Sequence, residues 1–423
     1  MDCDNRYFWG IVFGQGIVFL FRLSINLKDT NIMSDVIHHK DKLRHPFTFH
    51  GEGASYFIIC LVNLFLSVIT LGIYAPWAMV RCRRYIYENT ELHGVRFNYH
   101  ATGGALIISW ILMTLLYLLV AFIASVSSEI VSVVIFIMLL MVIPFFIVKS
   151  LQYQAIMTSL NNVRFAFRGS MGEGWRVIAG LPIVLIIAQF IVLMIFAFLP
   201  ANSLEGLIFK LGTIIVLSML MGAVMNGVLY SRWMQFIGNN ASFGIHRFNS
   251  EANRMFCVKA FLIAICIMIP FAAVMFYIMS SSMFGLIFSR SLSSGISSDA
   301  VMGILTGYFV YLLGALVAAA YIWMSMRNHF MNTLSLADGK IRFQSTISFH
   351  AMVLQFMAVF FVSLITLGLA YPWMKMRYLR FMANNSFVIG DLDEITLADH
   401  DDQVDTGAFA VIARGALPVT PFI

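Results

Sequence analysis

Eight long apolar runs limit the structures that this sequence can adopt. They cover about residues 54–75, 104–126, 130–148, 177–199, 207–230, 255–280, 300–325 and 349–371. A helix needs about 20 mostly apolar residues to cross a bilayer, and backbone groups in lipid must bond within their own segment. The runs therefore predict membrane-spanning α-helices. The short segments of alternating polarity that a lipid-facing β-barrel needs are not found in the sequence.

The composition excludes a soluble fold. Of the 423 residues, 60% are hydrophobic and 11% are charged, and the mean hydropathy is +0.85. A soluble domain carries about 25% charged residues, because its whole surface faces water. We therefore predict an all-α membrane protein, a polytopic helical bundle of about eight hydrophobic segments. Six of these segments are long enough to span the membrane securely.

The basic residues predict the orientation of the spans. Of the 27 Lys and Arg residues, 21 fall in five clusters, at 40–44, 81–96, 149–176, 232–259 and 327–380. Short cytoplasmic loops carry an excess of Lys and Arg, so we expect these connecting loops to be cytoplasmic. The six central helices then form three hairpins, 104–148, 177–230 and 255–325, whose tips point to the other side.

The first and last apolar runs have basic residues on both flanks. Lys40–Arg44 and Arg81–Arg84 flank the first run, and Arg342 and Lys375–Arg380 flank the last. A single crossing would leave one basic cluster outside, against the orientation rule. A re-entrant segment or short hairpin would keep both flanks inside. The sequence favours the second alternative but leaves the first open.

The two ends of the chain repeat one motif. Residues 47–94 align with 343–390 without a gap, and 13 of the 48 positions are identical, including ITLG at 69–72 and 365–368. Weaker copies of a following segment are VRFNYH at 95–100, VRFAFR at 163–168, GIHRFN at 244–249 and IRFQST at 341–346. The sequence thus predicts degenerate internal repeats. Each repeat contains an extended aromatic stretch, an apolar helix or hairpin, a basic helix end and a turn, and all copies start from the same face.

FTFHGEGASYF at 47–57 and TLGIYAPWAMVRCRRYIYENTELHGVRFNYHATG at 70–103 resemble the YjgN-like family of bacterial inner-membrane proteins. The resemblance covers about residues 47–390. It implies a multi-pass protein of the bacterial inner membrane. The family has no assigned activity, so the resemblance supplies no reaction.

We accordingly divide the chain into three parts. Residues 1–46 form an N-terminal extension, residues 47–390 the YjgN-like transmembrane domain, and residues 391–423 an acidic tail that we expect to be disordered. Met33 begins a stretch that reads as a natural start. Whether residues 1–32 are a start-site artefact is left open.

The repeated motif contains two helix breakers followed by aromatic and basic residues. Gly72 is a poor helix former, and the ring of Pro76 clashes with the carbonyl four residues back, so we predict a helix break. Trp77 suits the membrane interface, and Arg81 and Arg84 lie three residues apart on one helical face. The second copy assigns the same roles to Gly368, Pro372, Trp373, Arg377 and Arg380, and Asn89 and Asn385 mark the two helix stops.

These residues have two interpretations. In the first, the tryptophans and arginines are interface anchors that fix the depth of the helix. In the second, the arginines of the two copies form a paired site for an anionic lipid headgroup. The first is the simpler interpretation, and the sequence does not exclude the second.

The sequence offers no catalytic, cofactor-binding or metal-binding residues. It contains no phosphate-binding loop, HExxH motif or GxSxG motif, so we do not expect an enzyme. No charged residue lies near the middle of any apolar run, which disfavours an ion-coupled pump. We expect membrane lipids as partners, and no nucleic acid. The function that we expect is a non-proton-coupled transporter or a lipid-handling protein. The alternative is a non-catalytic envelope scaffold or assembly factor.

Overall fold

The computed structural model describes residues 44–126, 128–201, 203–288, 298–392, 398–399 and 402–415. Residues 1–43 lie outside the described residues, and with them most of the predicted N-terminal extension and the alternative start at Met33. From Arg44 onward the chain forms one structural unit.

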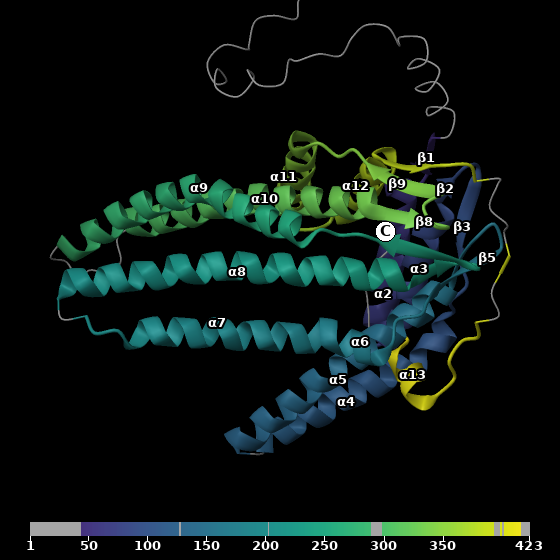
Figure 1. Cartoon of the computed structure of the whole chain (residues 1–423), viewed down its shortest axis with the longest axis horizontal. Coiled ribbons are helices and arrows are strands. Elements are labelled where there is room, and N and C mark those ends of the chain that lie inside the picture. The colour runs from purple at the N-terminus through teal and green to yellow at the C-terminus, as the bar shows by residue number, and fades with distance from the viewer. Residues whose placement is uncertain are drawn as a thin grey trace, which may run out of the picture. The chain divides into compact units, whose positions relative to one another are not determined.

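Five copies of one plan, strand–helix–helix–strand, build residues 44–389 (Figure 1). Unit 1 consists of β1 (Arg44–Phe49), α2 (Gly53–Ile69), α3 (Ala75–Glu88) and β2 (Thr90–Leu92). Unit 2 consists of β3 (Val95–Tyr99), α4 (Gly103–Val126), α5 (Glu129–Ile156) and β4 (Thr158–Leu160). Unit 3 consists of β5 (Val163–Phe167), α6 (Met171–Trp175), the π-helical η1 (Arg176–Gly180), α7 (Leu181–Phe198), α8 (Leu204–Asn240) and β6 (Ala241–Phe243). Unit 4 consists of β7 (His246–Ser250), α9 (Arg254–Phe288), α10 (Ser298–Thr333) and β8 (Leu334–Leu336), and unit 5 of β9 (Ile341–Ser345), α11 (Phe349–Ile365), α12 (Tyr371–Asn384) and β10 (Ser386–Ile389).

The ten strands close into one antiparallel barrel, here called the ring. Each strand pairs with the strands before and after it in the chain, and β1 pairs with β10, where Arg44 lies opposite Ile389. The prediction of an all-α bundle is therefore wrong. The sequence does show the extended stretches, but strands of three to six residues are too short for a clear alternating pattern. Each strand pairs on one edge with the other strand of its unit and on the other edge with a neighbouring unit, so the pairing is complete only when all five units assemble.

One apolar layer fills the ring. Each unit contributes one pair of directly opposed residues, and all five first strands supply a phenylalanine. The pairs are Phe47 with Leu92, Phe97 with Leu160, Phe165 with Phe243, Phe248 with Leu336, and Phe343 with Val388. Nine of these ten side chains belong to one apolar cluster, and the ring of Phe165 lies 4.8 Å from that of Phe243. The phenylalanine of the Arg-Phe pair in the repeated motif is thus the residue that points into the ring.

Both ends of every helical hairpin are tied to each other at the ring. In each unit, the N–H of the residue that follows the first strand donates to the last residue before the second strand. The five bonds are His50 to Asn89 (2.9 Å), His100 to Met157 (2.8 Å), Arg168 to Asn240 (2.8 Å), Glu251 to Thr333 (3.4 Å) and Thr346 to Asn385 (3.0 Å). All five hairpins therefore start and finish at the same end of the unit.

Six helical segments among the described residues are long and apolar enough to cross a membrane. They are Gly103–Val126, Glu129–Ile156, Met171–Phe198, Leu204–Asn240, Arg254–Ser282 and Val301–Thr333. The first and last apolar runs instead form the short hairpins α2–α3 and α11–α12. A helix of 17 residues such as α2 is about 25 Å long, less than the roughly 30 Å of a bilayer core.

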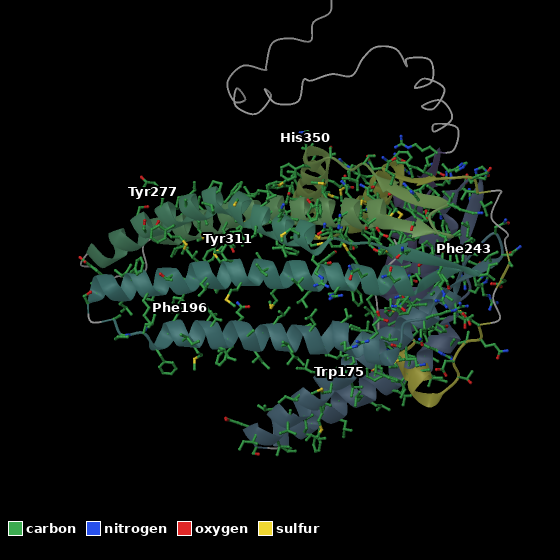
Figure 2. The ribbon with its side chains drawn as sticks, in the orientation of Figure 1. Trp175, Phe196, Phe243, Tyr277, Tyr311 and His350 are labelled. Atoms are coloured by element: carbon green, nitrogen blue, oxygen red, sulfur yellow. The ribbon has the colours of Figure 1, made fainter. Side chains whose placement is uncertain are left out.

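Polar and apolar side chains separate along the helices. Figure 2 shows nitrogen and oxygen atoms concentrated around the strands, where Phe243 lies, whereas Phe196 and Tyr277 lie on helices far from them. None of the residues in the most apolar window of Met171–Phe198 is buried, as expected for helices surrounded by lipid.

Part of the acidic tail is ordered against the helices. Residues 408–413 form α13 (Ala408–Ala413), which packs on α4 and α5 (Figure 1). The sequence predicts disorder from Asp391 onward, because acidic residues and prolines dominate this segment. The composition could not show that the acidic residues have basic partners on α5 and after β5.

Candidate functional site between α3 and α4

The ITLG motif forms the turn of the first short hairpin. The hydroxyl of Thr70 donates to the carbonyl of Leu66 in α2 (2.7 Å) and accepts from the N–H of Tyr74 before α3 (3.0 Å). Leu71 and Gly72 have φ values of 48° and 89°. The second copy repeats this arrangement at Thr366, Leu367 and Gly368, with φ of 51° and 85° at the last two. The predicted helix break is thus a complete turn between two helices.

Pro76 and Trp77 lie in the first turn of α3. Pro76 interrupts no hydrogen bond there, because the first N–H groups of a helix have no partner within it. The indole of Trp77, 38% exposed, covers Gly103 so closely that a Cβ at this glycine would overlap the ring. Pro372 and Trp373 stand in the same positions of α12, where Trp373 covers Gly53.

Arg84 and Arg380 hold neighbouring units together. We call the contact between the second helix of one unit and the start of the next unit a seam, so that α3 and α4 meet at seam 1/2. At every seam, the side chain six residues before a strand donates to a backbone carbonyl of the next unit. The five bonds are Arg84 to Ala101 (2.9 Å), Gln152 to Gly169 (3.3 Å), Gln235 to Ala252 (2.9 Å), Asn328 to Ile347 (2.8 Å) and Arg380 to Gly51 (2.9 Å).

Asn89 and Asn385 terminate their helices. Each is the C-cap residue, and each side-chain amide donates to the carbonyl four residues back, Tyr85 (2.7 Å) and Phe381 (2.8 Å). The predicted helix stops are therefore bonded to the helix end, and they lie one residue before a ring strand.

A cavity of about 420 Å³ lies at seam 1/2. Its lining contains two guanidinium groups and, among the described residues, no carboxylate. The amides of Gly103 and Gly104 belong to the first turn of α4, where N–H groups lack partners inside the helix and the helix dipole is positive. The lining residues are Tyr74, Trp77, Val80, Arg81, Arg84, Thr102, Gly103 and Gly104. This combination suits an anion whose apolar part extends along the helices.

The second arginine pair has different surroundings. The guanidinium of Arg380 donates to the carbonyl of Gly51. The residue after Gly51 is Glu52, which is at the position equivalent to Thr102 at seam 1/2. A carboxylate there disfavours a bound anion. The two arginine pairs lie at different seams, and one arginine of each pair donates to a carbonyl at its own seam. The structure therefore presents one of the two predicted copies, Arg81 and Arg84, in a cavity.

The other half of this cavity was not predicted from the sequence. Thr102, Gly103 and Gly104 come three to five residues after the end of β3, and Thr102 accepts from the N–H of Ala105 (3.3 Å) as a helix cap. The signal was a capping residue before an apolar run, and the same place in the other units holds Glu52, Ser170, Asn253 and Ser348. Among the described residues, no cluster of three His, Cys, Asp or Glu side chains is arranged to hold a metal ion.

Six candidate spans attached to one ring define a multi-pass membrane protein. The chain belongs to the family described as "Bacterial protein of unknown function (DUF898)", whose model matches residues 44–411. The match begins with β1 and ends within α13.

Curated relatives agree with the family. The chain is 40% identical over 396 residues to the inner membrane protein YjgN of Salmonella typhimurium strain LT2, covering 92% of this chain and 100% of that protein. It is 38% identical over 402 residues to the inner membrane protein YjgN of Escherichia coli K12, with the same coverage. No solved structure matches the chain. The resemblance found in the sequence is confirmed, and the protein is a multi-pass protein of the inner membrane.

Proposed function

We propose that this protein handles lipids by binding the headgroup of an anionic phospholipid at seam 1/2. The observation that carries the proposal is the cavity lined by Arg81, Arg84 and the first turn of α4. Arginine is well suited to phosphate, and amides at a helix N-terminus bind anions. The exposed apolar faces of the helices beside the cavity would accommodate acyl chains. The proposal includes no catalytic step and no nucleic acid.

The apolar layer of the ring supports lipid binding over transport of a polar solute. All ten side chains at this level of the ring are apolar, so the ring axis offers a solute no polar group there. A lipid at a seam needs no passage through the ring, because it reaches the cavity from the membrane.

The proposal is tested by titrating the purified protein with phosphatidylglycerol and measuring bound lipid by native mass spectrometry. We expect Arg81→Gln to weaken binding about fivefold, because one partly exposed arginine–phosphate pair contributes about 1 kcal/mol. Binding of the zwitterionic phosphatidylethanolamine should change little. Inorganic phosphate, added as a competitor, distinguishes a site for free phosphate from a site for lipid.

Arg377→Gln is the matched control. Arg377 is exposed like Arg81 and stands at the equivalent position of α12, but its seam contains Glu52. We expect this variant to retain phosphatidylglycerol binding. Equal losses in both variants, or none in Arg81→Gln, would contradict the site at seam 1/2.

A further inference from the structure

The acidic tail lies across seam 2/3, between α5 and the start of unit 3, and binds the basic residues of this seam. The carboxylate of Asp405 accepts from Lys149 Nζ (2.6 Å), and the carboxylate of Asp402 pairs with the guanidinium of Arg168 (2.9 Å). Asp399 accepts from the backbone N–H of Arg164 (3.1 Å). Three aspartates within seven residues thus contact α5 of unit 2 and the start of unit 3.

α13 holds this acidic segment in place. The hydroxyl of Ser109 in α4 donates to the carbonyl of Ile412 and accepts from the N–H of Gly415 (2.9 Å). Ala410 and Ala413 are buried. The guanidinium of Arg414 lies 5.3 Å from the ring centre of Tyr153 and donates to the carbonyl of Asp405 (3.0 Å).

The position of Lys149 is equivalent to that of Arg81. Arg81 stands nine residues before β2, and Lys149 stands nine residues before β4. At seam 1/2 this position lines an open cavity, whereas at seam 2/3 it binds a carboxylate. The bond from Lys149 and the N–H of Gly407 hold the pKa of Asp405 below its usual range, so this carboxylate is charged at neutral pH.

A cavity of about 280 Å³ remains between the tail and seam 2/3, with lining residues from both unit 2 and unit 3. Its lining combines three cationic side chains with the two aspartates of the tail. The cations are Lys149, Arg168 and Arg414, and the aspartates are Asp402 and Asp405. Without these two carboxylates, all charged side chains in the lining would be cationic, as they are at seam 1/2.

We propose that seam 2/3 is a second binding site for the phosphodiester of an anionic phospholipid, and that Asp402 and Asp405 occupy it as an internal competitor. The ligand class rests on the function proposed for seam 1/2; the competition rests on the contacts of the tail. The side chains of Asp402 and Asp405 are 38% and 48% exposed. Ion pairs this exposed are weak and screened by salt, so a membrane rich in anionic lipid can displace them.

The test uses the full chain with Asp402→Asn and Asp405→Asn together. These changes keep the size of both side chains and remove their charge. We expect the double variant to bind one more phosphatidylglycerol per chain than the unchanged protein, by native mass spectrometry. Adding Lys149→Gln should remove that extra lipid. Glu88→Gln with Asp338→Asn is the matched control, because it removes two exposed acidic charges away from the seam and should add no lipid.

A second measurement follows the tail in the unchanged protein. Hydrogen exchange of the Val411 amide, which donates to Gly407 (2.9 Å), should be faster in nanodiscs of phosphatidylglycerol than in nanodiscs of phosphatidylcholine. The proposal that the tail competes with lipid would be overturned if the double variant bound no extra lipid. It would also be overturned if the extra lipid persisted after Lys149→Gln was added. If lipid binds only because negative charge has been lost, the control variant would gain as much lipid as the double variant. That result would also overturn the proposed competition by the tail.

The two proposals fail in different ways. If Arg81→Gln loses no lipid while the double variant gains one that depends on Lys149, the function proposed for seam 1/2 is wrong and the site at seam 2/3 stands. If Arg81→Gln loses lipid and the double variant gains none, the reverse holds.

Discussion

At the scale of single residues, the position six residues before each second strand shows how three types of side chain perform one task in five units. Arginine, glutamine and asparagine all donate to a carbonyl of the next unit at these seams. A carbonyl at the junction of two units has no strand partner, and leaving it unbonded would cost free energy. All five positions have a side chain with a hydrogen-bond donor. The positive charge of the two arginines is not needed for this bond.

Arg84 allows a test of this distinction. We expect Arg84→Gln to keep nearly full stability, because Gln152 and Gln235 make the same bond in units 2 and 3. Arg84→Ala should lower the free energy of unfolding by about 1 kcal/mol, the net value of one hydrogen bond. Unfolding in mixed micelles measures both values. If the two variants were equally destabilised, the charge and not the bond would be the stabilising feature.

At the scale of elements, the turns of the short hairpins differ from the ends of the long helices. The ITLG turn uses a threonine hydroxyl to bond both helices and needs two residues with positive φ. Glycine adopts such a conformation at little cost, whereas residues with a Cβ do so less readily. Leu71 nevertheless adopts it, and its side chain is 93% exposed at the tip of the hairpin. An apolar tip of this kind fits a hairpin that ends within the lipid.

The glycine of this turn should be sensitive to substitution. We expect Gly72→Ala to destabilise the protein by about 1 kcal/mol, although a Cβ there would meet no atom within 4 Å, because φ is 89°. Gly212→Ala in α8 is the control. A Cβ at Gly212 also meets no atom within 4 Å, and alanine there should stabilise the helix by about 0.5–1 kcal/mol. Thermal unfolding of the two variants in detergent should give shifts of opposite sign; a matching shift would count against the role of φ.

At the scale of the whole molecule, the ring decides on which side the connections lie. Every hairpin leaves the ring and returns to it, so all basic clusters from residue 81 to residue 380 gather at one end. The sequence predicts this end to be cytoplasmic from its Lys and Arg content. The two short hairpins are neighbours, because α12 of unit 5 packs against α2 of unit 1.

Cysteine labelling tests this arrangement. In a chain with the native cysteines replaced, we expect Arg96→Cys and Arg247→Cys on the ring to be hidden from a membrane-impermeant maleimide in intact cells. Glu129→Cys and Glu205→Cys, at the far ends of the hairpins, should react. Leu71→Cys should react neither in cells nor in inverted vesicles, because its hairpin ends within the bilayer. Labelling of Leu71→Cys from outside would mean that the first hairpin reaches the opposite surface.

The sequence by itself determined the apolar segments, the repeat and the residues of the turns, since each of these depends on interactions within a few residues. An apolar helix satisfies its backbone locally, and Gly72, Pro76 and Asn89 act on neighbouring turns. Only the tertiary structure decided the ring, the cavity at seam 1/2 and the docking of the tail. Each strand pairs on one edge within its unit and on the other edge with a neighbouring unit, so the ring closes only when all five units assemble. Lys149 likewise meets Asp405 across 256 positions of the chain. Such contacts exist only once the five units have closed around their layer of phenylalanines.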